Sequence, residues 1–400
     1  MTGSQRSRWK PIAGFAALTL IAVGGAGVYL AKALLHGNRV SALPAAATLE
    51  RSDLAPAPTS DRVVSPAIEP PRPVKSAAPR VTPAPATVPR DQPLPSASPR
   101  EAPTIMFRIT AMGESHGSLG LVDLAARDRT PTTTSLRCER LHFMRDRGVC
   151  LAAERGMFAT YGAVVFDRSF QSLHQLRLNG SPSRVRVAPD GQHAAVTVFI
   201  SGHSYATTDF STQTTFIDLR TGDVVIQDME SFTVWRNEDR FKSSDFNFWG
   251  VTFTRDSNRF YATLGTGGRT YLVEGDLARR EARVVREGVE CPALSPDNRH
   301  VAFKKRTGGL LTAVTWRLSV LDLASGKDWE LAETRSVDDQ VEWLNDQTVM
   351  YGLIAAPSGT AVTNVWTVPG DGTGAPVLLL QGAASPTVVA RESDGQTSAR

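Results

Sequence analysis

The sequence has few of the residues that build metal and redox sites. Its 400 residues include three cysteines and seven histidines, with no Cys-x-x-Cys pair and no His-rich spacing. A zinc site therefore has no support, and we expect no metal and no cofactor. Cys138 and Cys150 are close enough in sequence to form a disulfide, although a hairpin turning at residues 146–147 would not place them directly opposite each other. Cys291 is expected to be a small buried apolar side chain.

Charged residues are absent from residues 11–31, and no acidic residue occurs before Glu50. At about 1.5 Å per residue, that run is long enough to cross a bilayer core of about 30 Å as a helix. Three basic residues precede it, so the positive-inside tendency keeps the N-terminus in the cytoplasm. We expect an uncleaved signal-anchor helix. The alternative is a signal peptide cleaved near the Ala-rich residues 45–47.

Large apolar residues are scarce in residues 41–104, which hold fifteen of the 25 prolines. Such a segment cannot form a helix and has too little apolar surface to build a core. We expect a disordered Pro/Ala-rich stalk that lifts the following domain off the membrane. The alternative is that this low-complexity segment arose by neutral drift, without selection for a particular length. The net charge of +4 is spread along the chain, so we expect no nucleic-acid partner.

The sequence does contain a turn motif that returns at intervals of roughly 50 residues. Each copy places an Asp at a tight turn, in residues 121–128, 165–171, 217–223, 274–281, 321–327 and 368–374. A second motif, an apolar residue followed by a Pro/Asp-type turn and a β-branched run, occupies 187–199, 253–264 and 294–305, with weaker copies at 143–152 and 343–353. Asp and Gly in these turns tolerate the positive φ of short hairpins. Repeated hairpins of this length predict a β-propeller.

The two motifs also predict how the propeller closes. The first motif marks six hairpins, but the second motif marks only five, because no Pro/Asp-type turn precedes residue 121. The predicted fold is an all-β, six-bladed propeller of four-stranded antiparallel blades. Strand 385–390 closes the ring by joining the N-terminal strands 105–136. One blade is longer than the others, which places an insertion at residues 237–247.

Residues 113–117, Gly-Glu-Ser-His-Gly, match the G-x-S-x-G nucleophile elbow of α/β-hydrolases. That chemistry needs a strand before Ser115 and a helix after it. The sequence after Ser115 is Gly-rich and typical of a β-strand. We therefore expect a polar loop between the second and third strands of the shared blade.

The blade pattern also predicts where a ligand would bind. In an antiparallel four-stranded blade, the two tight hairpins lie on one face and all other connections lie on the opposite face. The opposite face is expected to carry the irregular segments 111–118, 200–213, 236–249, 304–314 and 354–363. On that face, Asp and Trp side chains at the channel mouth could offer hydrogen bonds and apolar area to a ligand. The candidates on this rim are Asp245, Asn247, Trp249, Glu290, Asp338, Asp339 and Trp343.

These rim candidates have a structural alternative, in which each Trp packs between blades and each Asp caps a turn. Under the binding hypothesis, alanine at Asp338 and Asp339 should leave folding intact and weaken partner capture.

Several segments resemble a known family. Residues 294–303 (LSPDNRHVAF) and 316–326 (WRLSVLDLASG) look like repeats of TolB and related WD-repeat-like propellers. Residues 246–273 and 335–343 are similar to membrane-anchored TolB-like proteins of actinobacteria. The resemblance covers about residues 105–390 and implies a six-bladed propeller outside the cytoplasmic membrane. The separate N-terminal α/β domain of TolB has no counterpart, so a partnership with an outer-membrane lipoprotein or a colicin is not implied.

The expected order is a cytoplasmic tail (1–10), a transmembrane helix (11–35), a stalk (36–104), the propeller (105–390) and a disordered tail (391–400). The propeller would lie outside a cytoplasmic membrane that the chain crosses once. Propellers bind more often than they catalyse. We therefore expect a non-enzymatic scaffold that binds an envelope protein or cell-wall ligand at the channel mouth, with a role in translocation as one option. The alternative is a propeller-type lyase or hydrolase, or the regulatory propeller of an envelope peptidase.

Overall fold

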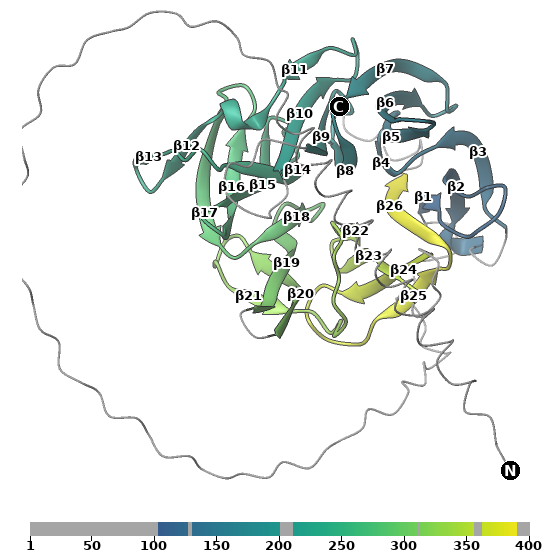
Figure 1. The fold of residues 1–400 in the computed structure, drawn as a ribbon. Coiled ribbons are helices and arrows are strands. Elements are labelled where there is room, and N and C mark those ends of the chain that lie inside the picture. The colour runs from purple at the N-terminus through teal and green to yellow at the C-terminus, as the bar shows by residue number, and fades with distance from the viewer. Residues whose placement is uncertain (1–102, 127–129, 201–210, 310–311, 356–361, 390–400) are drawn as a thin grey trace, which may run out of the picture. The chain divides into compact units, whose positions relative to one another are not determined.

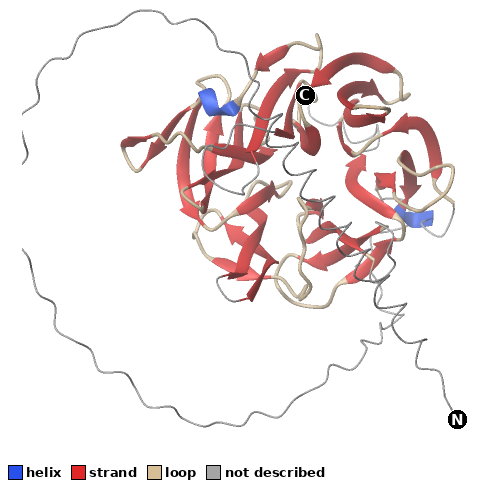
Figure 2. Cartoon of the chain, in the orientation of Figure 1, coloured by secondary structure: helices blue, strands red, loops and turns tan. Residues whose placement is uncertain are grey.

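The computed structural model describes residues 103–126, 130–200, 211–309, 312–355 and 362–389. Strands predominate in these residues, and the two helices are single 3-10 turns, η1 (Leu124–Ala126) and η2 (Met229–Ser231) (Figure 2). No helix in this part of the chain has the length and apolar character needed to span a bilayer. The segments predicted before residue 103 and after residue 389 lie outside the described residues.

The strands form six sheets, arranged as the blades of one ring (Figure 1). Blades 2, 3, 5 and 6 run from an innermost to an outermost strand in chain order. Blade 2 contains β4 (Arg140–Met144), β5 (Arg147–Arg155), β6 (Ala159–Asp167) and β7 (Ser172–Leu178). Blade 3 contains β8 (Ser181–Val187), β9 (His193–Ile200), β10 (Ser211–Asp218) and β11 (Val224–Ile226). Blade 5 contains β18 (Glu290–Leu294), β19 (His300–Gly309), β20 (Thr312–Asp322) and β21 (Asp328–Glu330). Blade 6 contains β22 (Glu342–Asn345), β23 (Thr348–Ile354), β24 (Thr363–Pro369) and β25 (Val377–Leu380).

Blade 4 carries the insertion that its length predicted. Its four main strands are β14 (Asn247–Phe253), β15 (Arg259–Thr266), β16 (Arg269–Asp276) and β17 (Glu281–Glu287). Two further strands, β12 (Thr233–Arg236) and β13 (Asp239–Phe241), extend its outer edge, and β12 pairs with β17 in parallel. The expectation of four antiparallel strands per blade is therefore wrong for this sheet. The insertion starts earlier than predicted, because η2 and β12 precede residue 237.

Blade 1 is shared between the two ends of the described chain, as the hairpin count predicted. It contains β26 (Ala383–Val389), β1 (Thr104–Ile109), β2 (Ser118–Asp123) and β3 (Thr132–Arg137). In the β1–β26 ladder, Thr104 lies opposite Val389 and Met106 lies opposite Thr387. Figure 1 shows the C-terminal strand β26 beside β1. The ring is therefore closed by antiparallel hydrogen bonds, which pair the inner edge of β1 with β26.

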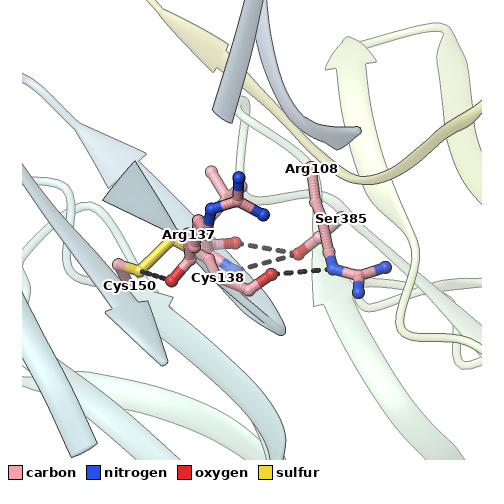
Figure 3. Close-up of a disulfide and its surroundings, with 6 residues drawn as sticks. Arg108, Arg137, Cys138, Cys150 and Ser385 are labelled. Atoms are coloured by element: carbon pink, nitrogen blue, oxygen red, sulfur yellow. Dashed lines mark hydrogen bonds between the residues drawn. A yellow bond between two sulfur atoms is a disulfide. The ribbon is translucent and has the colours of Figure 1, made fainter. Parts of the chain in front are cut away.

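The closing strand also attaches to blade 2 (Figure 3). The Ser385 hydroxyl donates to the carbonyl of Leu141 at 3.0 Å and accepts from the amide of the same residue at 3.1 Å. Beside this contact, Cys138 and Cys150 form a disulfide. Cys150 lies opposite Leu141 in the β4–β5 ladder, whereas Cys138 lies before β4, in the connection from blade 1. The two cysteines are thus not cross-strand partners, and the bridge instead joins β5 to that connection.

Six apolar clusters build the core, one between each pair of neighbouring blades in the described residues. Aromatic side chains fill several of them by lying over a glycine on the next strand. In blade 4, Phe260 lies opposite Gly275, and a Cβ at Gly275 would come within 2.1 Å of the Phe260 ring. In blade 2, Phe166 lies over Gly148 in the same way. Each glycine therefore provides the space that lets an aromatic ring pack toward the adjacent blade.

The blades present two faces with different connections. On one face, hairpin turns join the first strand of a blade to the second and the third strand to the fourth. We call this the turn face, and we call the opposite face the loop face. The GESHG segment is a connection between β1 and β2 on the loop face, and a strand follows it, which confirms the loop interpretation. Residues 304–309 and 312–314, expected to be an irregular loop, instead belong to the long hairpin of β19 and β20.

Removing β26 tests the closure of the ring. A chain ending at Gly382 should lose cooperative thermal unfolding, because β1 loses its ladder and β4 loses the Ser385 contact. Circular dichroism and calorimetry would measure this loss. A chain lacking only residues 391–400 is the control and should unfold as the full chain does. Equal transitions in both shortened chains would contradict a closing role for β26.

Candidate functional site

Asp245 lies on the loop face and fastens the turn between β15 and β16. Its carboxylate accepts hydrogen bonds from the Ser243 hydroxyl at 2.5 Å, the Thr266 hydroxyl at 2.6 Å and the Gly267 amide at 2.7 Å. The Gly267 amide, together with the two hydroxyls, lowers the pKa of Asp245 to about 2. The carboxylate is thus fully engaged within the chain, as a turn cap would be.

Asn247, Trp249 and Trp343 also make contacts within the propeller. The Asn247 side-chain oxygen accepts from the Thr212 amide at 2.9 Å, which joins blade 4 to blade 3. Trp249 is buried against Gly265. Trp343 is 4% exposed and donates its indole N–H to the Ala293 carbonyl at 2.9 Å, between blades 5 and 6. These three side chains offer little surface to a ligand.

The three remaining candidates gather at the loop-face end of the channel, each beside a cation. Lys304 lies 2.5 Å from the carboxylate of Asp338 and 3.9 Å from that of Glu290. The Trp316 indole N–H donates to Glu290 at 3.2 Å. Burial alone would raise the pKa of Asp338, but the charge and hydrogen bond of Lys304 outweigh it and lower that pKa below its ordinary value.

Asp338 and Asp339 differ in exposure, although they are neighbours in sequence. The Asp338 side chain is 60% exposed, whereas Asp339 is buried and lies 2.9 Å from Arg140 of blade 2. Asp338→Ala is therefore a surface change. Asp339→Ala would also remove a partly buried ion pair, so we now expect this change to destabilise the fold.

The segment 338–342 closes the channel at the loop face. The Gln340 amide group donates to the carbonyls of Val251 and Pro292, both at 3.1 Å, and so reaches blades 4 and 5. Glu342 pairs with Arg186 of blade 3, on the opposite side of the ring. The cavity left among these side chains is about 30 Å³, enough for about one water molecule. This end of the channel has no room for a substrate.

His142 lies directly beneath this plug and is 3% exposed. Its Nδ1 accepts from the Val187 amide at 3.1 Å, and its Nε2 lies 3.6 Å from Glu342. Burial and the nearby Arg186 hold the pKa of His142 well below its usual range, so the imidazole is neutral. Burial also lowers the pKa of Arg186 to about 10, which still leaves it charged at neutral pH. This His–Glu–Arg cluster is the arrangement closest to acid–base chemistry in the described channel. Its side chains are 3–15% exposed, and they line a pocket of about 280 Å³ on the turn-face side.

The loop face carries a second feature, which the sequence interpretation missed. The four most exposed large apolar side chains of the described residues are Met157 (94%), Phe158 (81%), Met112 (71%) and Ile354 (66%). Met157 and Phe158 lie in the β5–β6 connection of blade 2, and Met112 lies in the β1–β2 connection of blade 1. Ile354 is the last residue of β23 in blade 6, just before the β23–β24 connection. Phe199, 40% exposed, is the penultimate residue of β9 in blade 3. We call these five residues the apolar arc, because blades 6, 1, 2 and 3 are consecutive in the ring.

The ion pair between Arg186 and Glu342 can be tested by removing one partner. Glu342→Gln should lower the free energy of unfolding by about 3–5 kcal/mol, because it leaves a buried guanidinium uncompensated. The double change Arg186→Met with Glu342→Leu should recover most of that loss. Asp338→Asn is the control and should cost about 1 kcal/mol or less, because its carboxylate is 60% exposed and Lys304 keeps Glu290 at 3.9 Å. Equal losses in urea unfolding for Glu342→Gln and Asp338→Asn would contradict a buried plug.

The turn-capping role of Asp245 predicts a pH dependence. Its pKa is about 2 in the folded state, below the ordinary value near 3.9 of an unfolded chain. The carboxylate therefore stabilises the fold above about pH 4, and this contribution is lost as the pH falls toward about 2. Asp245→Asn should melt below the wild type at pH 7 and approach it at pH 2.5. Asp239→Asn, an exposed change in the neighbouring hairpin, should show no such convergence.

No known protein-family model matches the chain, and no curated protein matches it. Among solved structures, the chain is similar to TolB from Acinetobacter baumannii, with 15% identity over 72% of this chain and 66% of that one and a TM-score of 0.46. It is similar to a Mycobacterium tuberculosis puromycin-hydrolyzing peptidase, with 14% identity over 73% of this chain and 45% of that one and a TM-score of 0.44. The chain thus spans about two thirds of TolB and less than half of the peptidase. At this level, the likenesses carry no argument about function, and the six-bladed propeller is established by the strand pairing of the chain itself.

Proposed function

We propose that this protein is a non-enzymatic, membrane-tethered scaffold whose propeller lies outside the cytoplasmic membrane and binds an envelope protein on its loop face. The observation that carries the proposal is the apolar arc. Four of its five side chains are the most exposed large apolar groups of the described residues, and with Phe199 the arc extends over four neighbouring blades. Exposed apolar groups gathered on one face are typical of protein-binding surfaces. The uncharged run at residues 11–31 supports the tether.

The loop-face end of the channel favours binding over catalysis. An enzyme needs an acid or base that can reach its substrate. In the described channel, the side chains of His142 and Glu342 are 3% and 15% exposed. On the loop-face side they border a cavity of about 30 Å³, and on the turn-face side they line a pocket of about 280 Å³. Ser115 of the GESHG segment precedes a strand rather than a helix, so it lacks the framework of a nucleophile elbow. We therefore place recognition around the channel mouth rather than inside it.

Paired substitutions on two surfaces test the proposal. A photo-reactive amino acid at Ser115, on the loop face, would capture the partner in cells. Met157→Ser with Phe158→Ser should reduce capture about tenfold or more, since central apolar anchors carry much of the binding energy. The matched control, Val224→Ser with Val225→Ser, removes two exposed apolar groups from the outer strand β11.

Circular dichroism should show the same melting temperature for both double variants and the wild type, because all four side chains are exposed. Equal capture by the loop-face variant and the β11 variant would overturn the proposal. Turnover of an envelope substrate by the purified full chain would also overturn it, in favour of the enzyme alternative.

A further inference from the structure

A groove lies on the turn face between blades 5 and 6, on the face of the propeller opposite the apolar arc. Its volume is about 570 Å³. Blade 5 contributes His300 and Trp329, and blade 6 contributes the turn residues 346–348 and the segment 369–377. Trp343, predicted as a rim residue, also lines it, whereas the 338–342 segment and the apolar arc do not. The groove is therefore separate from the surface to which we assign partner binding.

Trp329 forms a fixed aromatic wall of this groove. Its indole N–H donates to the Gly370 carbonyl at 2.9 Å, which holds the ring across the boundary between the two blades. The His300 ring packs edge-on against it, with 5.9 Å between ring centroids. Because the indole is already held in place, a ligand that contacts it would not have to order it.

The groove is also acidic. Asp346 and Asp371 are exposed residues of its lining, which contains no Lys or Arg among the described residues. The Thr373 amide and hydroxyl donate to Oδ1 of Asp371, at 2.9 and 2.8 Å. The bonds from Thr373, its amide first, lower the pKa of Asp371, so the carboxylate is ionised at neutral pH. An aromatic wall beside uncompensated carboxylates suits a ligand that is both apolar and basic.

The chain contains such a ligand immediately before the propeller. Residues 86–102 include Pro89-Arg90 and Pro99-Arg100, with Pro93 and Pro95 between them. The same Pro-Arg pair also occurs upstream, at residues 71–72 and 79–80. Proline-rich segments lose little conformational freedom on binding and dock into aromatic grooves, and nearby acidic residues can pair with their arginines.

The position of the entry point brings this segment within reach. The Pro103 carbonyl accepts from the Leu124 amide at 3.1 Å, so the chain enters blade 1 on the turn face. Blade 1 is the neighbour of blade 6, and the groove lies two sheet spacings away, or about 20 Å. Arg90 precedes Pro103 by 13 residues, which span up to about 40 Å at 3.1 Å per residue.

We propose that the groove between blades 5 and 6 binds the chain's own proline-rich segment, residues 86–102, through its Pro-Arg units. The prolines would pack on Trp329, and the arginines would pair with Asp346 and Asp371. The occupant is this segment of the same molecule, since the basic and proline-rich sequence lies next to the groove along the chain. A second copy and an unrelated ligand are the competing occupants.

Cross-linking within the full chain tests this assignment. A photo-reactive amino acid replaces Leu94, between the two Pro-Arg units, and mass spectrometry maps the cross-links. We expect intramolecular links to the groove, at residues 300, 329, 346–348 and 369–377. A mixture of isotope-labelled and unlabelled chains separates links within one molecule from links between two. Links only between molecules, or links with no preference for the groove, would overturn the proposal.

Charge variants supply the controls. Asp346→Asn with Asp371→Asn, or Arg90→Ala with Arg100→Ala, should each reduce the cross-linked fraction about fivefold, as expected for two exposed ion pairs. Asparagine still caps a turn, so the first pair should fold normally. Glu274→Gln with Glu281→Gln, a matched pair of carboxylates near the turn-face end of blade 4, should leave the fraction unchanged. Equal effects of the groove pair and this control pair would contradict the proposal.

Discussion

The ladder between β26 and β1 is the interaction on which the rest of the propeller depends. It joins Thr104 to Val389 and so brings the two ends of the described domain into one sheet. Each blade buries its apolar faces only against its two neighbours, and the six clusters form a closed series. Without this ladder, the clusters on both sides of blade 1 would lose packing surface together. Closure therefore stabilises all six blades and fixes which connections share a face.

Closing six blades leaves a central space that must be filled, because innermost strands of neighbouring blades form no common ladder in the described structure. Here the filling is polar. Arg186 pairs with Glu342 across the ring, Arg140 pairs with Asp339, and the Gln340 amide group reaches two further blades. Such pairs add little net stability over a well-packed apolar centre, but losing one partner is costly. The channel centre is thus constrained by the fold, and the outer connections are freer to acquire binding residues.

The blade count, the closing strand and the blade that carries the insertion could all be predicted from sequence, because hairpin turns need particular residues at local spacings. The site could not be predicted as well. Asp245 was placed on the correct face, but its oxygens are engaged by Thr266 and Gly267, whose approach depends on the β15–β16 hairpin. The partners Arg186 and Glu342 are 156 residues apart, and no local pattern links them. The alternating arginines of β8, Arg184 and Arg186, were a signal that this strand faces a polar centre.

Topology would also keep the proposed tether apart from the proposed recognition surface. Both ends of the described domain lie on the turn face, since β1 begins there and β26 ends there. If residues 86–102 dock on that face as proposed, they would not compete with a partner bound on the loop face. The tight hairpins of the turn face need Asp and Gly for their geometry, which leaves the grooves between blades as the places where chemistry can vary. The loop face has fewer such constraints, so it can expose Met157 and Phe158 without loss of a turn.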